Sequence, residues 1–261
     1  MLRFLEAASP PQALRKAYLD GLQEPQELYV ERLVSSGKTW CYGEIAYAVV
    51  NAGQLVEFFA ATSHAGRIES LFDEAMAASG ATSALCKSFN TQLLYAALSR
   101  PVEVTPIGSL FRRVADTSFV PQDTLKFRLG SVDDVPAIAR LNDGFFEGTS
   151  EILSYAEAGG LLVLSACGEL AGCGIAAPVI PGRADIDIGM WAAPGHRRKG
   201  YGSHIAAYLK HFCLAKGLRP ICGCGSENIA SHRALTAAGF VCEHRLLRIT
   251  WPRLALGQRN D

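Results

Sequence analysis

Residues 195–203 read Gly-His-Arg-Arg-Lys-Gly-Tyr-Gly-Ser, a basic segment punctuated by glycine. Polar and apolar residues alternate before it (184–191), as in a half-buried strand, and apolar residues recur at helical spacing after it (205–212). The expected local order is therefore strand, glycine loop, helix. The first N–H groups of such a helix have no intrahelical partner, and the helix dipole favours an anion there. The segment predicts a cradle for a pyrophosphate with positive charge at its rim.

A second motif follows the next strand-like run (220–224). It reads Asn-x-x-Ser-x-x-x-Leu-x-x-x-Gly over residues 228–239 and predicts a short helix that Gly239 closes as a C-cap. The loop pattern Arg-x-x-Gly-x-Gly at 197–202 is weak alone, and a basic surface turn is its alternative. The chain lacks the glycine patterns of a P-loop or a dinucleotide-binding fold. Together, the two motifs resemble the GNAT superfamily of N-acetyltransferases.

This resemblance covers about half of the chain and implies a mixed α/β (α+β) fold. The C-terminal part would be a GNAT domain with a splayed, mostly antiparallel sheet flanked by helices, beside a smaller N-terminal α/β domain. The resemblance also implies acetyl-CoA as the acyl donor, with the loop holding its pyrophosphate and the Asn and Ser of the second motif holding its pantetheine arm. The implied cofactor-binding residues are Met190, Trp191, Ala192, Arg197, Arg198, Lys199, Gly200, Tyr201, Gly202, Ser203, Asn228 and Ser231.

Acetyl transfer to an amine needs a polarised thioester carbonyl and a base, because an alkyl amine is almost wholly protonated at neutral pH. In the family, a backbone N–H near the end of the fourth strand meets the thioester oxygen, which maps onto Trp191 or Met190. Many members carry a carboxylate four residues earlier, and Asp187 stands four before Trp191. Asp187 is the predicted base, and Asp185 on the same strand face is the second candidate. Both aspartates are also compatible with an ordinary solvated strand face.

The leaving group is where this chain departs from the family pattern. Many relatives place a Tyr seven residues after the Asn to protonate the CoA thiolate, but this chain has Leu235. A thiolate can leave with little help, since its pKa is near 8.5. Tyr201 and Tyr208 are substitute acids, although Tyr208 lies on the apolar face of its helix.

The acceptor is expected to be a small-molecule amine, because a second domain could close over it. A protein or peptide N-terminus is the alternative acceptor. A third hypothesis is a non-catalytic protein that binds acyl-CoA, which Leu235 supports and Asp187 opposes. With 25 basic and 25 acidic residues the net charge is zero, which argues against nucleic acid or an anionic membrane as partner. A homodimer stays open.

The chain has 261 residues, more than one typical domain. A polar, proline-marked stretch at 115–123 predicts a linker between an N-terminal domain (1–114) and the GNAT domain (124–261). From 124 the expected order begins with a strand and a helix that is capped by Ser131 or Asp133 and carries Ile138, Leu141 and Phe145 on one face. A short helix, three strands, the loop, a long helix, a strand and a short helix follow, and a final strand (245–251) completes the domain.

In the first domain, the order strand, helix, strand over 83–110 parallels the order from 221 to 251. We therefore infer an internal repeat, in which the first domain is a degenerate GNAT-like module without the phosphate loop. An unrelated α/β cap is the alternative.

Cysteine usage and the N-terminus bear on the compartment. The eight cysteines are too sparse for a disulfide scaffold, and most stand in apolar runs, as buried thiols do. Cys222 and Cys224 with Cys242 and His244 match no common zinc spacing, so we expect no metal. The N-terminus has an early acidic residue and no long apolar core, unlike a signal peptide, and no apolar run reaches membrane-span length. We therefore expect a cytoplasmic protein.

Overall fold

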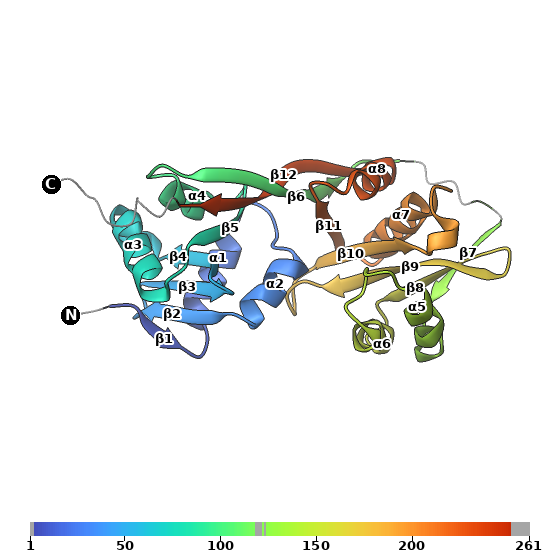
Figure 1. Ribbon diagram of the computed structural model, residues 1–261, viewed down its shortest axis with the longest axis horizontal. Helices are drawn as coiled ribbons and strands as arrows, with labels where there is room; N and C mark the ends of the chain where they lie inside the picture. The colour runs from blue at the N-terminus through green and yellow to red at the C-terminus, as the bar shows by residue number, and fades with distance from the viewer. Residues whose placement is uncertain (1–2, 118–121, 123, 252–261) are drawn as a thin grey trace. The chain divides into compact units, whose positions relative to one another are not determined.

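The computed structural model describes residues 3–117, 122 and 124–251. These residues form two compact units, and neither unit is one continuous stretch of chain (Figure 1). The first unit comprises 3–109, 225–227 and 244–251, and the second comprises the other described residues. Within the described residues, no helix is both long and apolar enough to cross a membrane.

The first unit is a mixed sheet with the strand order β1-β2-β3-β4-β5-β12. Its strands pair antiparallel, except that β4 and β5 are parallel. The strands are β1 (Leu5–Ala7), β2 (Lys38–Tyr42), β3 (Ala46–Asn51), β4 (Gln54–Ala60), β5 (Ser83–Lys87) and the last part of β12 (Phe240–Thr250). The helices are α1 (Gln12–Gly21), α2 (Leu28–Ser35), α3 (Ile68–Ser79) and α4 (Thr91–Ala97), with a 3₁₀ turn at Thr62–Arg67.

The second unit has the strand order β7-β8-β9-β10-β11-β6, and β10 and β11 are parallel. Its strands are β7 (Leu125–Leu129), β8 (Leu161–Ala166), β9 (Glu169–Pro178), β10 (Asp185–Ala192), β11 (Arg219–Gly225) and the last part of β6 (Glu103–Val114). Its helices are α5 (Val135–Leu141), α6 (Thr149–Glu157), α7 (Tyr201–Leu214) and α8 (Ile229–Ala237). Helices α5 and α6 cover one face of this sheet, and α7 covers the other (Figure 1).

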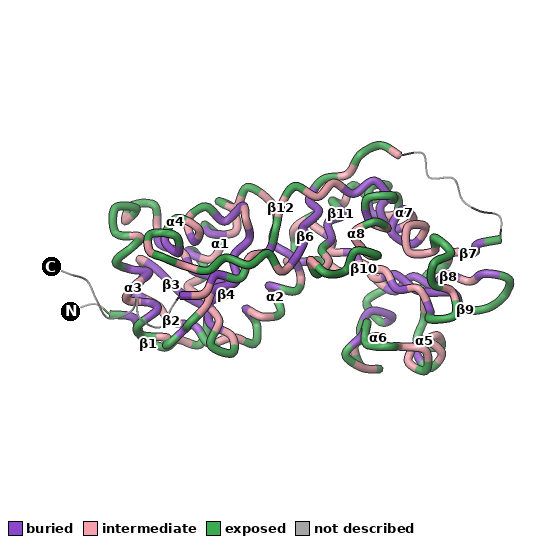
Figure 2. Tube along the Cα trace, turned by 45° about the horizontal axis from the view of Figure 1, so that its top comes forward, coloured by how far each residue is buried: buried purple, intermediate pink, exposed green. Residues whose placement is uncertain are grey.

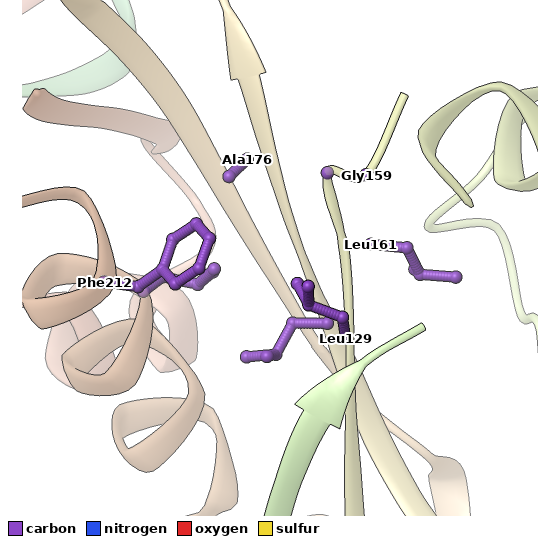
Figure 3. Close-up of a pocket in the computed structure, with 8 residues that line it drawn as sticks. Leu129, Gly159, Leu161, Ala176 and Phe212 are labelled. Carbon is purple, nitrogen blue, oxygen red and sulfur yellow. The ribbon is translucent and has the colours of Figure 1, made fainter. Parts of the chain in front are cut away.

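Both core faces of the second unit follow from the alternation along β10. Ile186 and Ile188 pack with the apolar face of α7, and Trp191 packs with α5 and α6. Figure 2 shows the buried residues concentrated along the central strands. A gap of about 10 Å³ between β7, β8, β9 and α7 is lined by apolar side chains and glycine, including Leu129, Leu161 and Phe212 (Figure 3). That volume is about one water molecule, and the lining offers no polar side chain, so the gap is a packing defect.

The predicted fold class, a mixed α/β fold with splayed sheets flanked by helices, is confirmed. The expected order of elements from 124 onward is present, with small shifts at the ends. Two details differ. Phe145 was expected on the first helix, but α5 ends at Leu141 and Phe145 lies in the loop that follows. The final strand was expected to complete the second domain, but residues 246–250 pair with β5 and lie in the first unit.

The linker predicted at 115–123 stays a prediction, and its residues 118–121 and 123 lie outside the described part of the chain. Residues 110–114 of β6 stand before it in sequence and belong to the second unit. Each unit therefore includes a strand segment from the other half of the chain. A fragment cut at the predicted linker would lose β6, the sheet neighbour of β11.

The turn that begins α5 is held by a capping box, as the sequence predicted for Ser131. Asp134 accepts the Ser131 N–H at 2.8 Å, and its carboxylate also binds the Arg128 guanidinium, with Nη1 at 2.7 Å and Nη2 at 2.5 Å. These hydrogen bonds hold the pKa of Asp134 below its ordinary value of 3.8, the Arg128 bond contributing most.

Asp134→Ala is expected to lower the free energy of unfolding by about 1 kcal/mol, the usual cost of losing such a cap. Because the folded-state pKa is depressed, this contribution is present above 3.8 and is lost as the pH falls through the lower folded value. Urea unfolding of the wild type and the variant at several pH values checks both statements. A difference that stayed constant down to pH 3 would contradict the role of the charge.

Candidate functional site

The site lies where β10 and β11 separate. The two strands pair in parallel from Asp185 to Asp187, after which β10 continues alone on that side to Ala192. The Ala184 carbonyl accepts from β11 at 2.9 Å, and the Ala193 N–H donates to β9 at 3.0 Å. Backbone N–H groups alternate in direction along a strand. The Met190 N–H therefore points into the opening beside β11, whereas the Trp191 N–H points toward β9.

The basic segment forms the predicted loop before a helix. Gly200 is the N-cap of α7 and has a φ of 80°, in the left-handed region that favours glycine. Arg198 also has a positive φ of 60°, so the loop holds one non-glycine residue in an uncommon conformation. Gly202 lies in the first turn, where an added Cβ would stand 3.5 Å from Met190 Sδ and 3.6 Å from Ala234 Cβ. Both distances are ordinary van der Waals contacts, so a single methyl group would fit at this position.

A pocket of about 790 Å³ opens at this place. Every residue predicted to bind the cofactor lines it, with the exception of Lys199. The start of α7 brings an excess of positive partial charge, and Arg198 adds a full charge. Asn228 is the N-cap of α8, and its Oδ1 accepts the Ser231 N–H at 3.0 Å. The two predicted motifs thus meet in one cavity, whose walls combine these polar and cationic groups with apolar residues such as Met190 and Ala234.

The two candidate bases stand earlier along β10 than the pocket residues and do not line the pocket. Asp185 stands opposite Arg219 in the parallel register and approaches its guanidinium, with Nε to Oδ1 at 4.0 Å. Asp187 occupies the last paired position, at the base of the opening. Burial and then the charge of Asp187 raise the pKa of the Cys222 thiol well above its ordinary value. The Asp187 carboxylate is therefore close enough to β11 for its charge to act on a buried thiol of that strand.

The substitute acids separate clearly. Tyr208 stacks on Phe127 with ring centroids 4.5 Å apart, within the core that α7 makes with the sheet. Tyr201 lines the pocket and its ring stacks on His196, with centroids 6.0 Å apart. Leu235 is 3% exposed and packs in the core. Of the three positions considered for an acid, Tyr201 alone lies in the pocket wall.

Sequence reasoning missed several residues of the pocket wall. Asp143, Gly144 and Phe145 come from the loop between α5 and α6, and Arg233 comes from the outer face of α8. Nothing in the local pattern marks them, because they reach the pocket through tertiary folding. His196 was part of the quoted segment but had no predicted role; it lines the pocket, and its Nδ1 has no hydrogen-bond partner among the described residues.

The first unit repeats this architecture without the loop. Strands β4 and β5 pair in parallel over two positions, Gln54 and Leu55, and then continue apart. Asn90 caps α4 as Asn228 caps α8, with Oδ1 accepting the Leu93 N–H at 3.2 Å. A 3₁₀ turn at Thr62–Arg67 stands where the second unit has its glycine loop. A parallel strand pair that separates beside a helix is thus common to both units.

Metal binding was not expected, and among the described residues no group of three or more His, Cys, Asp or Glu side chains is placed to hold a metal ion. The cysteines in this part of the chain are free thiols. Burial raises the pKa of Cys173 to about 12 and that of Cys213 to about 11, so both are neutral thiols at physiological pH.

Comparison with known families agrees with both halves of this description. The model of the acetyltransferase (GNAT) family matches residues 135–240, and that of an acetyltransferase (GNAT) domain matches residues 10–114. The chain belongs to the GNAT acetyltransferases, and both of its halves match that family. The suspected repeat is thereby confirmed. Among curated proteins, no sequence matches.

Solved structures show the same fold over the whole chain. A GNAT-family acetyltransferase from Colwellia psychrerythraea is 17% identical with a TM-score of 0.86, over 96% of this chain and 100% of the other. A tandem GNAT protein from the clavulanic acid biosynthesis pathway is 13% identical with a TM-score of 0.61, and both chains are covered completely. A GCN5-related N-acetyltransferase from Sphaerobacter thermophilus is 13% identical with a TM-score of 0.57, over 95% of each chain. At these identities the likeness concerns the fold.

Proposed function

We propose that this chain transfers an acetyl group from acetyl-CoA to the primary amine of a small molecule. One observation carries the proposal: the glycine loop, the start of α7 and the Asn228 cap line a single pocket, and the opening between β10 and β11 leads into it. A pocket of about 790 Å³ is of the size that holds a large organic ligand.

The second unit is the one proposed to hold the donor. The N–H groups that begin α7 and the Arg198 side chain receive the pyrophosphate, because both present positive charge to the same wall. Asn228 and Ser231 border the path of the pantetheine arm. Lys199 does not line the pocket, so we do not include it among the proposed cofactor-binding residues.

The chemistry follows from the strand geometry. The Met190 N–H, directed into the opening, donates a hydrogen bond to the thioester oxygen, and such an oriented donor contributes about 3 kcal/mol to transition-state stabilisation. The neutral amine attacks the carbonyl carbon, a C–N bond forms, and the C–S bond breaks. The amine proton passes to Asp187; this carboxylate stands three residues, about 10 Å, from Met190 along the strand, so a water molecule carries the proton. Trp191 and Asp185 take no direct part in these steps; they are neighbours of Met190 and Asp187 on β10.

The thiolate leaves without a side-chain acid at the position of Leu235, which is buried in the core. Tyr201 is the pocket residue with an ionisable hydroxyl that could protonate it. The acceptor enters on the α5 and α6 side, where the Phe145 ring is 37% exposed and lies against β10. An aromatic wall above a strand that carries two aspartates suits a cationic amine with an apolar part.

Thermal unfolding with acetyl-CoA tests the donor site first. Ligand at one hundred times its Kd is expected to stabilise the wild type by about 2.7 kcal/mol, an upward shift of a few degrees. Gly202→Asp puts a side chain and a negative charge into the pocket and is expected to abolish the shift. Gly195→Asp is the matched control, because Gly195 belongs to the same segment but does not line the pocket.

A wild type that neither acetyl-CoA nor CoA stabilises would refute the proposed donor site. If the shift appears, release of the CoA thiol is then followed across a panel of small amines and peptide N-termini. Turnover with peptides alone would move the acceptor to the protein class, and binding without any turnover would favour a regulatory acyl-CoA-binding protein.

A further inference from the structure

The loop between α5 and α6 has a fixed shape. The Asn142 side chain closes it: Oδ1 accepts the N–H groups of Phe145 and Phe146 at 3.1 Å, and Nδ2 donates to the Phe146 carbonyl at 2.9 Å. The Phe145 ring faces β10, where a Cβ on Gly189 would stand 3.2 Å from its Cζ. This loop therefore forms the wall on the proposed acceptor side.

Asp143 connects this wall to two other parts of the pocket. Its Oδ1 accepts the indole Nε1–H of Trp191 at 2.9 Å, and its Oδ2 pairs with Nη2 of Arg197. The Trp191 side chain comes from the end of β10 and is buried, with 4% exposed. Arg197 begins the glycine loop, and its Nε donates to the Ala192 carbonyl at 3.3 Å. The Asp143 carboxylate thus connects the loop between α5 and α6, the end of β10 and the glycine loop.

The direction of the Arg197 side chain changes the interpretation of the loop motif. Its guanidinium is turned toward Asp143 and the end of β10, and both contacts use its donors. The hydrogen bonds from Trp191 and then Arg197 hold the pKa of Asp143 below its ordinary range, so the carboxyl is an anion at neutral pH. A carboxylate that lines an anion-binding pocket repels phosphate unless a cation neutralises it.

We propose that Asp143 is a positioning residue that ties the acceptor wall to the cofactor loop, and that the Arg197 side chain neutralises Asp143 instead of binding the pyrophosphate. This inference rests on the proposed function, because it concerns acetyl-CoA in the same pocket. The pyrophosphate is left to the backbone N–H groups at the start of α7 and to Arg198.

A double-mutant cycle on the acetyl-CoA Kd, measured by calorimetry on the full chain, separates the two roles of Arg197. Arg197→Gln leaves Asp143 unneutralised and is expected to weaken binding about tenfold. Asp143→Asn keeps an acceptor for Trp191 and is expected to bind acetyl-CoA at least as well as the wild type. The double variant is expected to return to within about threefold of the wild type. A double variant as weak as Arg197→Gln would show direct pyrophosphate binding and overturn the inference.

A second readout needs no ligand. Asp143→Ala removes the acceptor of the Trp191 indole and is expected to shift the tryptophan emission, whereas Asp143→Asn leaves it in place. The same pair of substitutions in a Trp191→Phe background identifies the signal, because Trp40 and Trp251 lie in the first unit. If Asp143→Ala and Asp143→Asn both gave the emission spectrum of the wild type, the link between Asp143 and Trp191 would be overturned. If the wild type fails to bind acetyl-CoA, the proposed function falls, and the emission still decides whether Asp143 holds Trp191.

Discussion

Asp187→Asn is expected to lower kcat for acetyl transfer about 10²- to 10⁴-fold, the usual contribution of a positioned general base. The acetyl-CoA Kd should stay within about threefold, because Asp187 does not line the pocket. The loss should shrink as the pH approaches the amine pKa near 10, where the nucleophile is already neutral. Rates with an amine from the screen, measured from pH 6 to pH 10, check the size and the pH dependence together.

Asp185→Asn is the matched control on the same strand face. Its carboxylate faces the Arg219 guanidinium, and such an ion pair at a partly exposed site contributes less than about 1 kcal/mol. A loss of no more than about fivefold is expected. If Asp185→Asn lost the rate and Asp187→Asn kept it, the two roles would be exchanged. If both variants kept it, the proton would leave by a route that uses neither aspartate.

The sequence predicted those parts of the site that depend on interactions between residues close together in the chain. The strand, glycine loop and helix follow from alternation, helical spacing and the freedom of glycine, and Gly200 has the positive φ that its place requires. Asn228 caps its helix through a hydrogen bond three residues ahead, a contact that a sequence motif can encode. These features need no knowledge of the rest of the chain.

The remainder depends on contacts between distant residues. Asp143 meets Trp191 across 48 positions, so no local period could indicate it. The expectation for Phe145 failed because the Asn142 side chain ends the helix by capping the turn that follows. The direction of the Met190 N–H depends on which neighbours pair with β10 on each side. The pairing of β12 with β5 places residues 246–250 in the first unit, and strand propensity alone does not predict that partner.

Glu57→Ala is expected to have the largest effect on stability, a loss of about 3–5 kcal/mol, because it removes the fully buried anion of a hydrogen-bonded network. Glu57 lies on β4 with its side chain fully buried. Its carboxylate accepts from Tyr47 Oη at 3.1 Å and Gln26 Nε2 at 2.8 Å, and it pairs with Arg15 Nη2 at 3.3 Å. Removing it would take the acceptor from the Tyr47 hydroxyl and one of two carboxylates from Arg15 and Gln26, which both also bind Glu31.

Asp20→Ala is the matched control, because Asp20 and Lys16 form an ion pair with side chains 46% and 74% exposed. This variant should change the free energy of unfolding by less than about 0.5 kcal/mol. Urea unfolding followed by tryptophan emission in a Trp191→Phe background reports on the first unit, where Trp40 and Trp251 lie. A loss below about 1 kcal/mol for Glu57→Ala would mean that water reaches the network and that it is not a closed core.

The same network explains why the first unit differs from the second in spite of the shared fold. Asn90 is the counterpart of Asn228, but it is 2% exposed and its Nδ2 donates to Tyr18 Oη at 3.2 Å. Lys87 at the end of β5 donates to the same hydroxyl at 2.8 Å and binds Gln26, and burial lowers its pKa. Charged and aromatic side chains thus occupy the place where the second unit keeps its strands open. Lys87→Met, which removes a buried charge while keeping the volume, should therefore cost far less stability than Glu57→Ala; an equal cost would show that Lys87 is an essential counter-ion of the network.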